Sequence, residues 1–259
     1  AKVDEKGVET QREVVKEERR LRVENQPYGS IMEETFKRAY KDHPYKWPVI
    51  GSMDHLDAAE EQDYKQFYAD FYIPNNAVLS IAGDFDKAQA KKWIEKYFST
   101  IPKGKDPYRP EVEEPALNGE VKDVVYDNIQ LPAVVMAYRI PEQGTEDYYA
   151  VSMLSTLLSS GQSSRFNKAL VDEKQLAVAS GAFPFSMEDP GLTLGVAIAN
   201  MGVDAEKLQA AMDEEIKKVQ NKMLRATTGK TAAELIESRS SPDKPNMGLT
   251  AWRGSIVRK

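Results

Sequence analysis

Residues 72–85 read Tyr-Ile-Pro-Asn-Asn-Ala-Val-Leu-Ser-Ile-Ala-Gly-Asp-Phe, and they contain a helix end, a strand and a helix start. A helical pattern over residues 57–71 ends here, because Pro74 disfavours helix in the residue before it. The apolar run of residues 77–83 predicts a short buried strand. Asp84 or Asp86 then caps a helix with a core-facing apolar stripe. That stripe comprises Ala90, Trp93, Ile94, Tyr97 and Phe98.

The same order of elements recurs about 115–118 residues later. Residues 194–200 predict a strand, and Asp204 begins a helix that should run to about residue 221. This recurrence suggests one supersecondary unit used in two domains. The remaining patterns predict helices at residues 8–23, 31–40, 146–158 and 163–172, and strands at 121–126, 133–140, 176–185 and 192–199.

A proline-punctuated charged stretch, residues 101–118, is the predicted linker. It separates a first domain, residues 1–100, from part of a second, residues 119–223. Residues 224–259 form an atypical tail with seven Lys or Arg and three Asp or Glu, which makes this end basic in an otherwise acidic chain.

The composition excludes several chemistries. The chain has 259 residues, a net charge of −6, no cysteine and two histidines, His43 and His55. It therefore has no disulfide, no thiol nucleophile and no three-histidine zinc site. The acidic balance argues against nucleic-acid binding, and no apolar run is long enough to span a membrane. The charged N-terminus has no signal-peptide pattern, so we expect a cytoplasmic protein or a leader outside this sequence.

The predicted helix over residues 8–23 places a carboxylate in an unusual position. At 100° per residue, Glu18 falls in the middle of the only apolar stripe, between the directions of Val14 and Leu21 on one side and Val15 on the other. A carboxylate on a buried face needs a partner or a metal. The simpler interpretation is a salt bridge to Arg22 at i+4. In isolation, the pattern leaves both open.

Several ordered stretches together resemble the pitrilysin/insulinase (M16) family of zinc metallopeptidases, in its two-domain bacterial form similar to mitochondrial processing peptidase subunits. The resemblance covers roughly residues 8–222 and rests on a set of segments rather than on one motif. These are residues 11–20, His43-Pro44-Tyr45 with residues 48–51, residues 72–85, Tyr97-Phe98 with Ile101-Pro102, and residues 157–161 with Ser163-Ser164-Arg165.

The resemblance implies a fold, a metal and a reaction. The fold would be α+β, with two related processing-peptidase-like domains that each pack helices on a mainly antiparallel sheet, both incomplete here. The family hydrolyses peptide bonds with zinc. Its inverted sequence motif, H-x-x-E-H, supplies two histidine ligands and a glutamate base. Glu18 matches the third zinc ligand. Gln11 stands where the family usually has a glutamate that supports the ligands, and its amide would tune them less.

The chain also departs from this family. No histidine precedes Glu18, so H-x-x-E-H is missing. We therefore expect a fragment of a zinc endopeptidase that is inactive alone and binds zinc weakly or not at all. Val171 and Val178 occupy positions where one half of such enzymes often carries Arg and Tyr, which favours the zinc-bearing type of half. Peptide substrate and a complementary M16-type half or subunit would be its partners.

A rival interpretation is a noncatalytic peptide-binding or chamber subunit of an M16-type complex, and another is a purely structural domain in which Glu18 pairs with Arg22. Relatives of this kind are often exported. We therefore expect a periplasmic or exported location, with a cytoplasmic one as the alternative.

Overall fold

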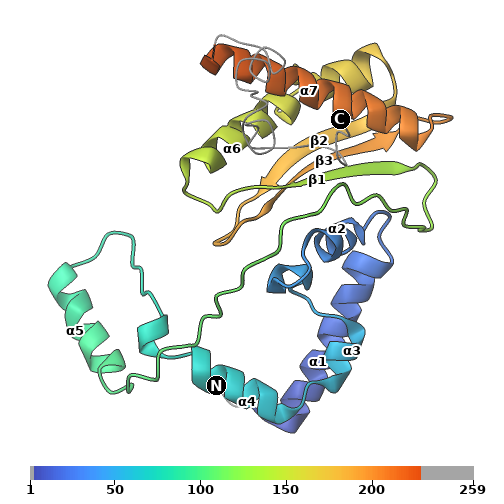
Figure 1. Cartoon of the computed structure of the whole chain (residues 1–259). Coiled ribbons are helices and arrows are strands. Elements are labelled where there is room, and N and C mark those ends of the chain that lie inside the picture. Colours follow the sequence, from blue (N-terminus) through green and yellow to red (C-terminus); the bar gives the residue numbers. More distant parts are fainter. Residues whose placement is uncertain (1–2, 229–259) are drawn as a thin grey trace, which may run out of the picture. The chain divides into compact units, whose positions relative to one another are not determined.

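The computed structural model describes residues 3–228, with side chains described up to residue 220. These residues form two compact units (Figure 1). Unit 1 comprises residues 3–26 and 42–114, and unit 2 comprises residues 27–41 and 115–228. The chain thus crosses between the units three times, and the segment of residues 27–41 belongs with the later part of the sequence.

Unit 1 is helical in its described residues. Helix α1 is capped by Asp4, whose carboxylate accepts a hydrogen bond from the Gly7 N–H at 2.9 Å. Asp86 caps α5 in the same way, with the Gln89 N–H donating to it at 2.6 Å. The elements are α1 (Glu5–Arg19), the π-helix η1 (Arg20–Glu24), η2 (Pro44–Lys46), α3 (Met53–Ala58), α4 (Glu61–Phe71), η3 (Pro74–Asn76) and α5 (Lys87–Phe98).

Unit 2 is built on a three-stranded antiparallel sheet in the order β1-β3-β2, with α6 and α7 on one side (Figure 1). In the register, Arg139 of β1 and Phe185 of β2 both pair with Leu192 of β3, and a bulge lies between Ala177 and Ala179. The elements are α2 (Ile31–Ala39), β1 (Ala133–Arg139), α6 (Glu146–Ser159), the π-helix η4 (Asn167–Glu173), β2 (Ala177–Phe185), β3 (Leu192–Ala199) and α7 (Ala205–Thr228).

The principal hydrophobic core lies in unit 2, where α6, η4 and α7 meet the sheet. Phe166, Leu170, Leu208 and Met212 are fully buried in it. Helix α2 joins the same unit through Phe36, whose ring meets that of Phe185 edge-on at 5.7 Å between centroids. The predicted α+β fold class is confirmed, because helices pack on an antiparallel sheet.

Two predicted strands are absent from the described residues. Residues 77–83 and 121–126 adopt no regular structure, because a strand needs a neighbour for its ladder of hydrogen bonds and none is provided for either segment. In the second segment, Asp123 instead pairs with Arg38 of α2 and accepts a hydrogen bond from the N–H of Val124.

The helices differ from expectation in detail. The helix expected at residues 57–71 is split into α3 and α4, because Glu60 and Asp63 form a capping box that starts a new helix. The helix expected at 163–172 continues as the π-helix η4, and α7 passes its expected end at residue 221.

From residue 229 on, the predicted basic tail lies outside the described residues. No helix between residues 3 and 228 is long and apolar enough to cross a membrane.

Candidate functional site

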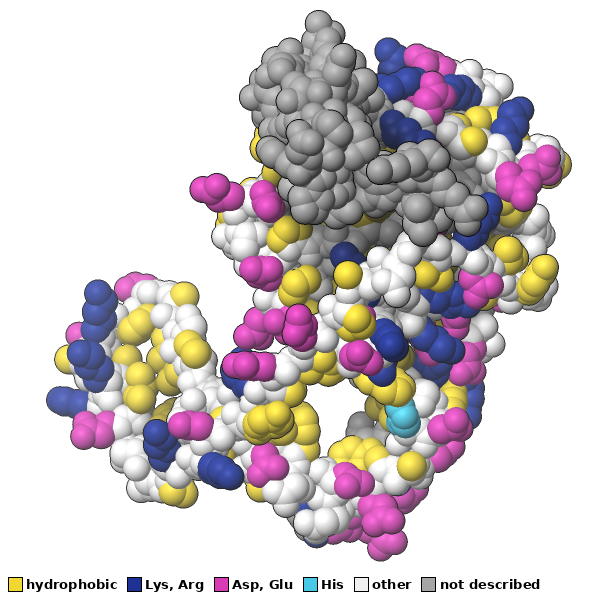
Figure 2. All heavy atoms as spheres, viewed as in Figure 1, with side chains coloured by type: hydrophobic (Ala, Val, Ile, Leu, Met, Phe, Trp, Pro, Cys, Tyr) yellow, Lys and Arg dark blue, Asp and Glu magenta, His cyan; other side chains and the backbone are white. Residues whose placement is uncertain are grey.

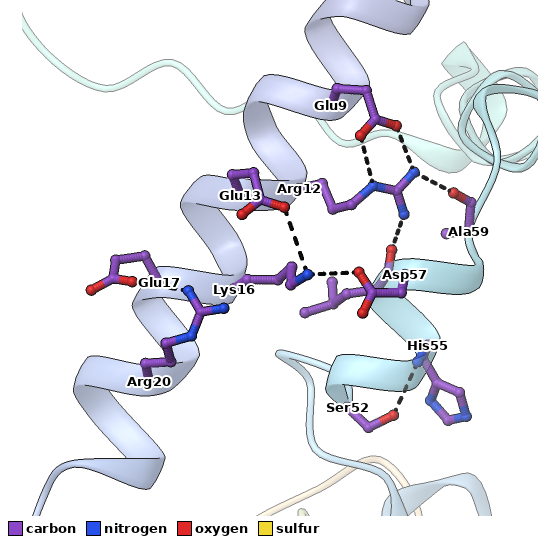
Figure 3. A network of polar contacts seen from close by, with 11 residues as sticks. Glu9, Arg12, Glu13, Lys16, Glu17, Arg20, Ser52, His55, Asp57 and Ala59 are labelled. Carbon is purple, nitrogen blue, oxygen red and sulfur yellow. Dashed lines mark hydrogen bonds and ion pairs between the residues drawn. The ribbon is translucent and has the colours of Figure 1, made fainter.

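Helix α1 carries both candidate site residues, Gln11 and Glu18. Its Arg12 and Lys16 point toward α3 and the residue that follows it (Figure 3). Arg12 donates to the carbonyl oxygens of Leu56 and Ala59, the latter at 2.7 Å, and to the Glu9 carboxylate. These bonds fix α1 through a guanidinium that is itself largely covered, with 10% of its side chain exposed.

A second contact one turn further along α1 strengthens this anchor. Lys16 Nζ lies 2.7 Å from Asp57 Oδ1 and 3.6 Å from Glu13 Oε1. The hydrogen bond from Lys16 holds the pKa of Asp57 below its usual range, and Asp57 in turn raises the pKa of Lys16. Both groups therefore stay charged over the whole neutral range, which keeps the anchor intact.

Glu18 lies on another side of α1 from this anchor. It is about 120° around the helix from Arg12 at 100° per residue. The apolar stripe predicted around Glu18 is largely uncovered, with Val14 53% and Leu21 56% exposed. The expectation of a buried face is therefore wrong for the described residues, because none of them packs over Val14 and Leu21.

The Glu18 carboxylate is engaged by a neighbour on its own helix. Arg22 Nε lies 3.2 Å from Glu18 Oε1, with 42% of the Glu18 side chain and 75% of that of Arg22 exposed. This is the i+4 pair that the helical spacing predicts. An exposed pair of this kind contributes little, typically below about 1 kcal/mol, so it does not prevent Glu18 from taking another partner. Gln11 is exposed on the same helix.

The described residues alone do not fit a zinc ion. No group of three or more His, Cys, Asp or Glu side chains between residues 3 and 220 is arranged to hold a metal. His43 is buried in its loop, where its Nδ1 accepts from the Tyr45 N–H at 3.2 Å. The ring of His55 instead meets that of Trp47 edge-on, at 5.2 Å between centroids. A zinc site that uses Glu18 would need ligands from outside this part of the chain.

A buried ion pair in unit 2 was not foreseen in the sequence. Arg165 Nη2 lies 2.7 Å from Glu215 Oε2, and Lys218 Nζ lies 2.7 Å from Glu215 Oε1. The pair joins the segment before η4 to α7. Burial alone would raise the pKa of Glu215, but hydrogen bonds from Lys218 and Arg165 outweigh it and lower the pKa.

Of the two positions compared with the Arg and Tyr pair, Val171 packs on the core and Val178 is half-exposed.

The sequence matches the family described as peptidase M16 inactive domain over residues 59–227, more than half of the chain. The chain belongs to the peptidase M16 family. Residues 196–259 also match the family described as virulence protein RhuM, which covers about a quarter of the chain and includes the basic tail. The M16 match begins at residue 59, after Glu18, so it does not bear on the candidate ligand.

Individual M16-type proteins resemble the chain over most of its length. It is 34% identical over 215 residues to the zinc protease PqqE of Helicobacter pylori, covering 80% of this chain and 48% of that protein. It is 26% identical over 190 residues to the uncharacterized zinc protease YmxG of Bacillus subtilis, covering 73% of this chain and 45% of that one. The chain thus spans about half the length of these curated relatives.

Solved structures give the same result for the fold. A crystal structure of a protease from Helicobacter pylori superposes with a TM-score of 0.79 at 31% identity, covering 92% of this chain and 56% of that one. The first half of the periplasmic protease PqqL from Escherichia coli superposes with a TM-score of 0.64 at 20% identity, covering 92% and 50%. At 20% identity, the similarity to PqqL shows only that the two proteins share a fold.

Proposed function

We propose that this chain is part of a zinc-dependent endopeptidase in which Glu18 is one of the zinc ligands. The observation that carries the proposal is the placement of Glu18. Its carboxylate stands half-exposed on an uncovered apolar stripe of α1, while Arg12 and Lys16 hold the helix from another side. A helix held in this way can present a half-exposed carboxylate that completes a metal shell whose other ligands come from elsewhere.

Gln11 is the proposed supporting residue, seven positions before Glu18 on the same helix. Residues around a metal shell orient the ligands through hydrogen bonds, and their loss typically costs 10–100-fold in metal affinity or activity. A neutral amide at this position would support the ligands less than a carboxylate would. The remaining ligands and the catalytic base would lie outside this chain, so we assign no residue of the chain to the proton transfer.

The substrates proposed for the parent protein are peptides or unfolded segments. Its proposed partner is a complementary M16-type half or subunit. Several relatives carry the name zinc protease, which supports zinc and peptide hydrolysis in the parent. The proposed location is periplasmic or exported, with a cytoplasmic one as the alternative.

A noncatalytic peptide-binding or chamber subunit is the second candidate. It is favoured by the description of the matched family as an inactive domain, together with the Glu18–Arg22 pair. In such a subunit the carboxylate would serve only its neighbour on α1, and a change at Glu18 would leave any activity of the complex intact.

Peptidase activity of the longest open reading frame that contains this chain separates the two candidates. We expect cleavage of a quenched fluorescent peptide that a chelator abolishes and zinc restores. Glu18→Ala should lower this activity at least 100-fold. Glu17→Ala is the matched control, because Glu17 forms a similar exposed pair with Arg20 at 3.0 Å. Equal effects of the two substitutions, or activity that resists the chelator, would exclude the ligand role.

A further inference from the structure

Helix α6 of unit 2 has an apolar side that stays largely uncovered among the described residues. Tyr149, Met153 and Leu157 are each more than half exposed and follow one another at intervals of four residues (here called the α6 stripe). No Lys, Arg, Asp or Glu occurs between residues 148 and 164. A helix without charge on any side is typical of one that is buried all around. We therefore expect the α6 stripe to have a cover.

The other side of α6 is the one that the sheet and α7 cover. Leu158 is buried in the core, and Ser155 Oγ lies 3.1 Å from Thr193 Oγ1 of β3. At 100° per residue, Met153 lies about 140° around the helix from Leu158. Within residues 3–228, α6 packs chiefly on β2 and α7. The α6 stripe therefore faces away from the elements that hold the helix in place.

The sequence that follows α7 has a pattern that matches the α6 stripe. Helix α7 ends at residue 228, and Gly229 is typical of the position after a helix end. Thr231 and Glu234 have the spacing of a capping box, which predicts the start of another helix. Its apolar residues, at the spacing of one helix face, are Ala232, Leu235 and Ile236. A connection as short as residues 229–231 would make this segment an antiparallel neighbour of α7.

Position and charge bring this segment toward α6. Helix α7 packs on α6, and Figure 1 draws the last turns of α7 on the side of unit 2 where α6 begins. Glu142, Glu146 and Asp147 are exposed around that start, and Figure 2 shows Asp and Glu side chains at this edge of unit 2. None of these three forms an ion pair within residues 3–220. The tail, residues 229–259, has six Lys or Arg and three Asp or Glu, so its charge complements this edge.

We propose that residues 231–239 of the tail cover the α6 stripe, with Leu235 and Ile236 packed against Tyr149 and Met153. The M16 match ends at residue 227, whereas the match to the RhuM family runs without a break from residue 196 in β3 to residue 259. The tail is thus matched together with α7 and not as a separate segment. A complementary half or subunit would then have to use a surface other than α6.

Peroxide oxidation of the methionines in the full chain, followed by peptide mapping, tests the proposal. Met201, in the loop after β3, is the internal reference, because it is 85% exposed and Met153 is 65% exposed. We expect Met153 to oxidise at least 10-fold more slowly than Met201. Leu235→Asp combined with Ile236→Asp should bring Met153 close to the rate of Met201. Ser240→Asp combined with Ser241→Asp is the matched control, since it adds the same charge outside the segment and should keep Met153 protected.

A substitution on α6 gives the reciprocal test. Met153→Asp should release the tail, so that the amides of residues 232–239 exchange their hydrogens at least 10-fold faster. Met201→Asp should leave this exchange unchanged. Both substitutions replace exposed side chains, so circular dichroism should show an unchanged fold in each variant.

The other results overturn the proposal. Met153 would oxidise as fast as Met201 in the wild type if nothing covered the α6 stripe. Protection that depends on protein concentration, with a dimer in light scattering, would identify a second copy as the cover. Protection that survives the double substitution at Leu235 and Ile236 would exclude the tail. Glu18→Ala should leave Met153 protected, because the proposal does not rest on zinc, so failure of the ligand role is distinguishable from failure of this proposal.

Discussion

Replacing Arg165 with methionine removes one of two cations that face the buried carboxylate of Glu215. The guanidinium contacts one carboxylate oxygen through two nitrogens, at 2.7 and 3.1 Å, and only 4% of the Glu215 side chain is exposed. Methionine keeps much of the length and apolar character of the arginine stem, so the substitution chiefly removes the charge. The Glu215 carboxylate then stays buried with Lys218 as its remaining cation.

The expected loss of stability follows from this geometry. Removing one partner of a buried ion pair costs about 3–5 kcal/mol. Lys218 still pairs with the other oxygen, and 30% of the Arg165 side chain is exposed. We therefore expect a loss of about 2–3 kcal/mol, at or below the lower end of that range. For a unit of this size the melting temperature should fall by about 7–11 °C.

Urea unfolding followed by circular dichroism at pH 7 measures this loss, with calorimetry for the melting temperature. The double variant Arg165→Met with Glu215→Leu should recover at least half of the lost stability, because replacing both partners with apolar groups is often neutral. Lys174→Met is the control, since it removes an exposed pair with Glu214 and should shift the midpoint little. A loss no larger than the control, or a double variant as unstable as the sum of the singles, would refute the reasoning.

Three further predictions concern the anchor of α1, the acid stability of α7 and the core. Arg12→Met should increase the hydrogen exchange of α1, because it removes the bonds to two carbonyls of the α3 region; unchanged exchange would contradict the anchoring role. Hydrogen bonds from Lys174 and Lys218 lower the pKa of Glu214 to about 2. The stability that these ion pairs contribute is therefore present above pH 4.5 and is lost as the pH falls toward about 2. Urea midpoints should fall less across that range in Glu214→Gln than in the wild type, because Asp57 and Glu215 also have lowered pKa values and lose their stabilisation there in both proteins. Phe166→Ala should cost about 3–5 kcal/mol in urea unfolding, whereas Leu157→Ala, at a half-exposed side chain, should cost far less.

Local signals in the sequence predicted the elements whose causes are local. Asp86 was expected among the caps of α5, and its carboxylate accepts from the helix N-terminus. The strand before Asp204 and the helix after it form as the pattern predicts. The pair of Glu18 with Arg22 also follows from spacing alone, because i and i+4 residues are neighbours on any helix.

Features that depend on distant partners could not be predicted in this way. Residues 77–83 have the composition of a strand, but pairing requires a neighbour that the described chain does not provide. Likewise, Trp93 has helical core spacing and is nevertheless exposed. The contacts of Arg12 with the α3 region join residues more than 40 positions apart, and only the basic i, i+4 spacing of Arg12 and Lys16 hints at a common partner.

The most direct test of Glu18 as a zinc ligand is the zinc content of the protein encoded by the longest open reading frame that contains this chain. Purified protein, dialysed against a weak chelator, should retain one zinc per chain by elemental analysis. Glu18→Ala should lose most of this zinc, whereas Glu17→Ala should retain it, and Gln11→Ala should weaken the affinity about 10-fold. Equal zinc content in the Glu18→Ala variant and the wild type, or no stoichiometric zinc in the wild type, would contradict the assignment of Glu18 as a zinc ligand.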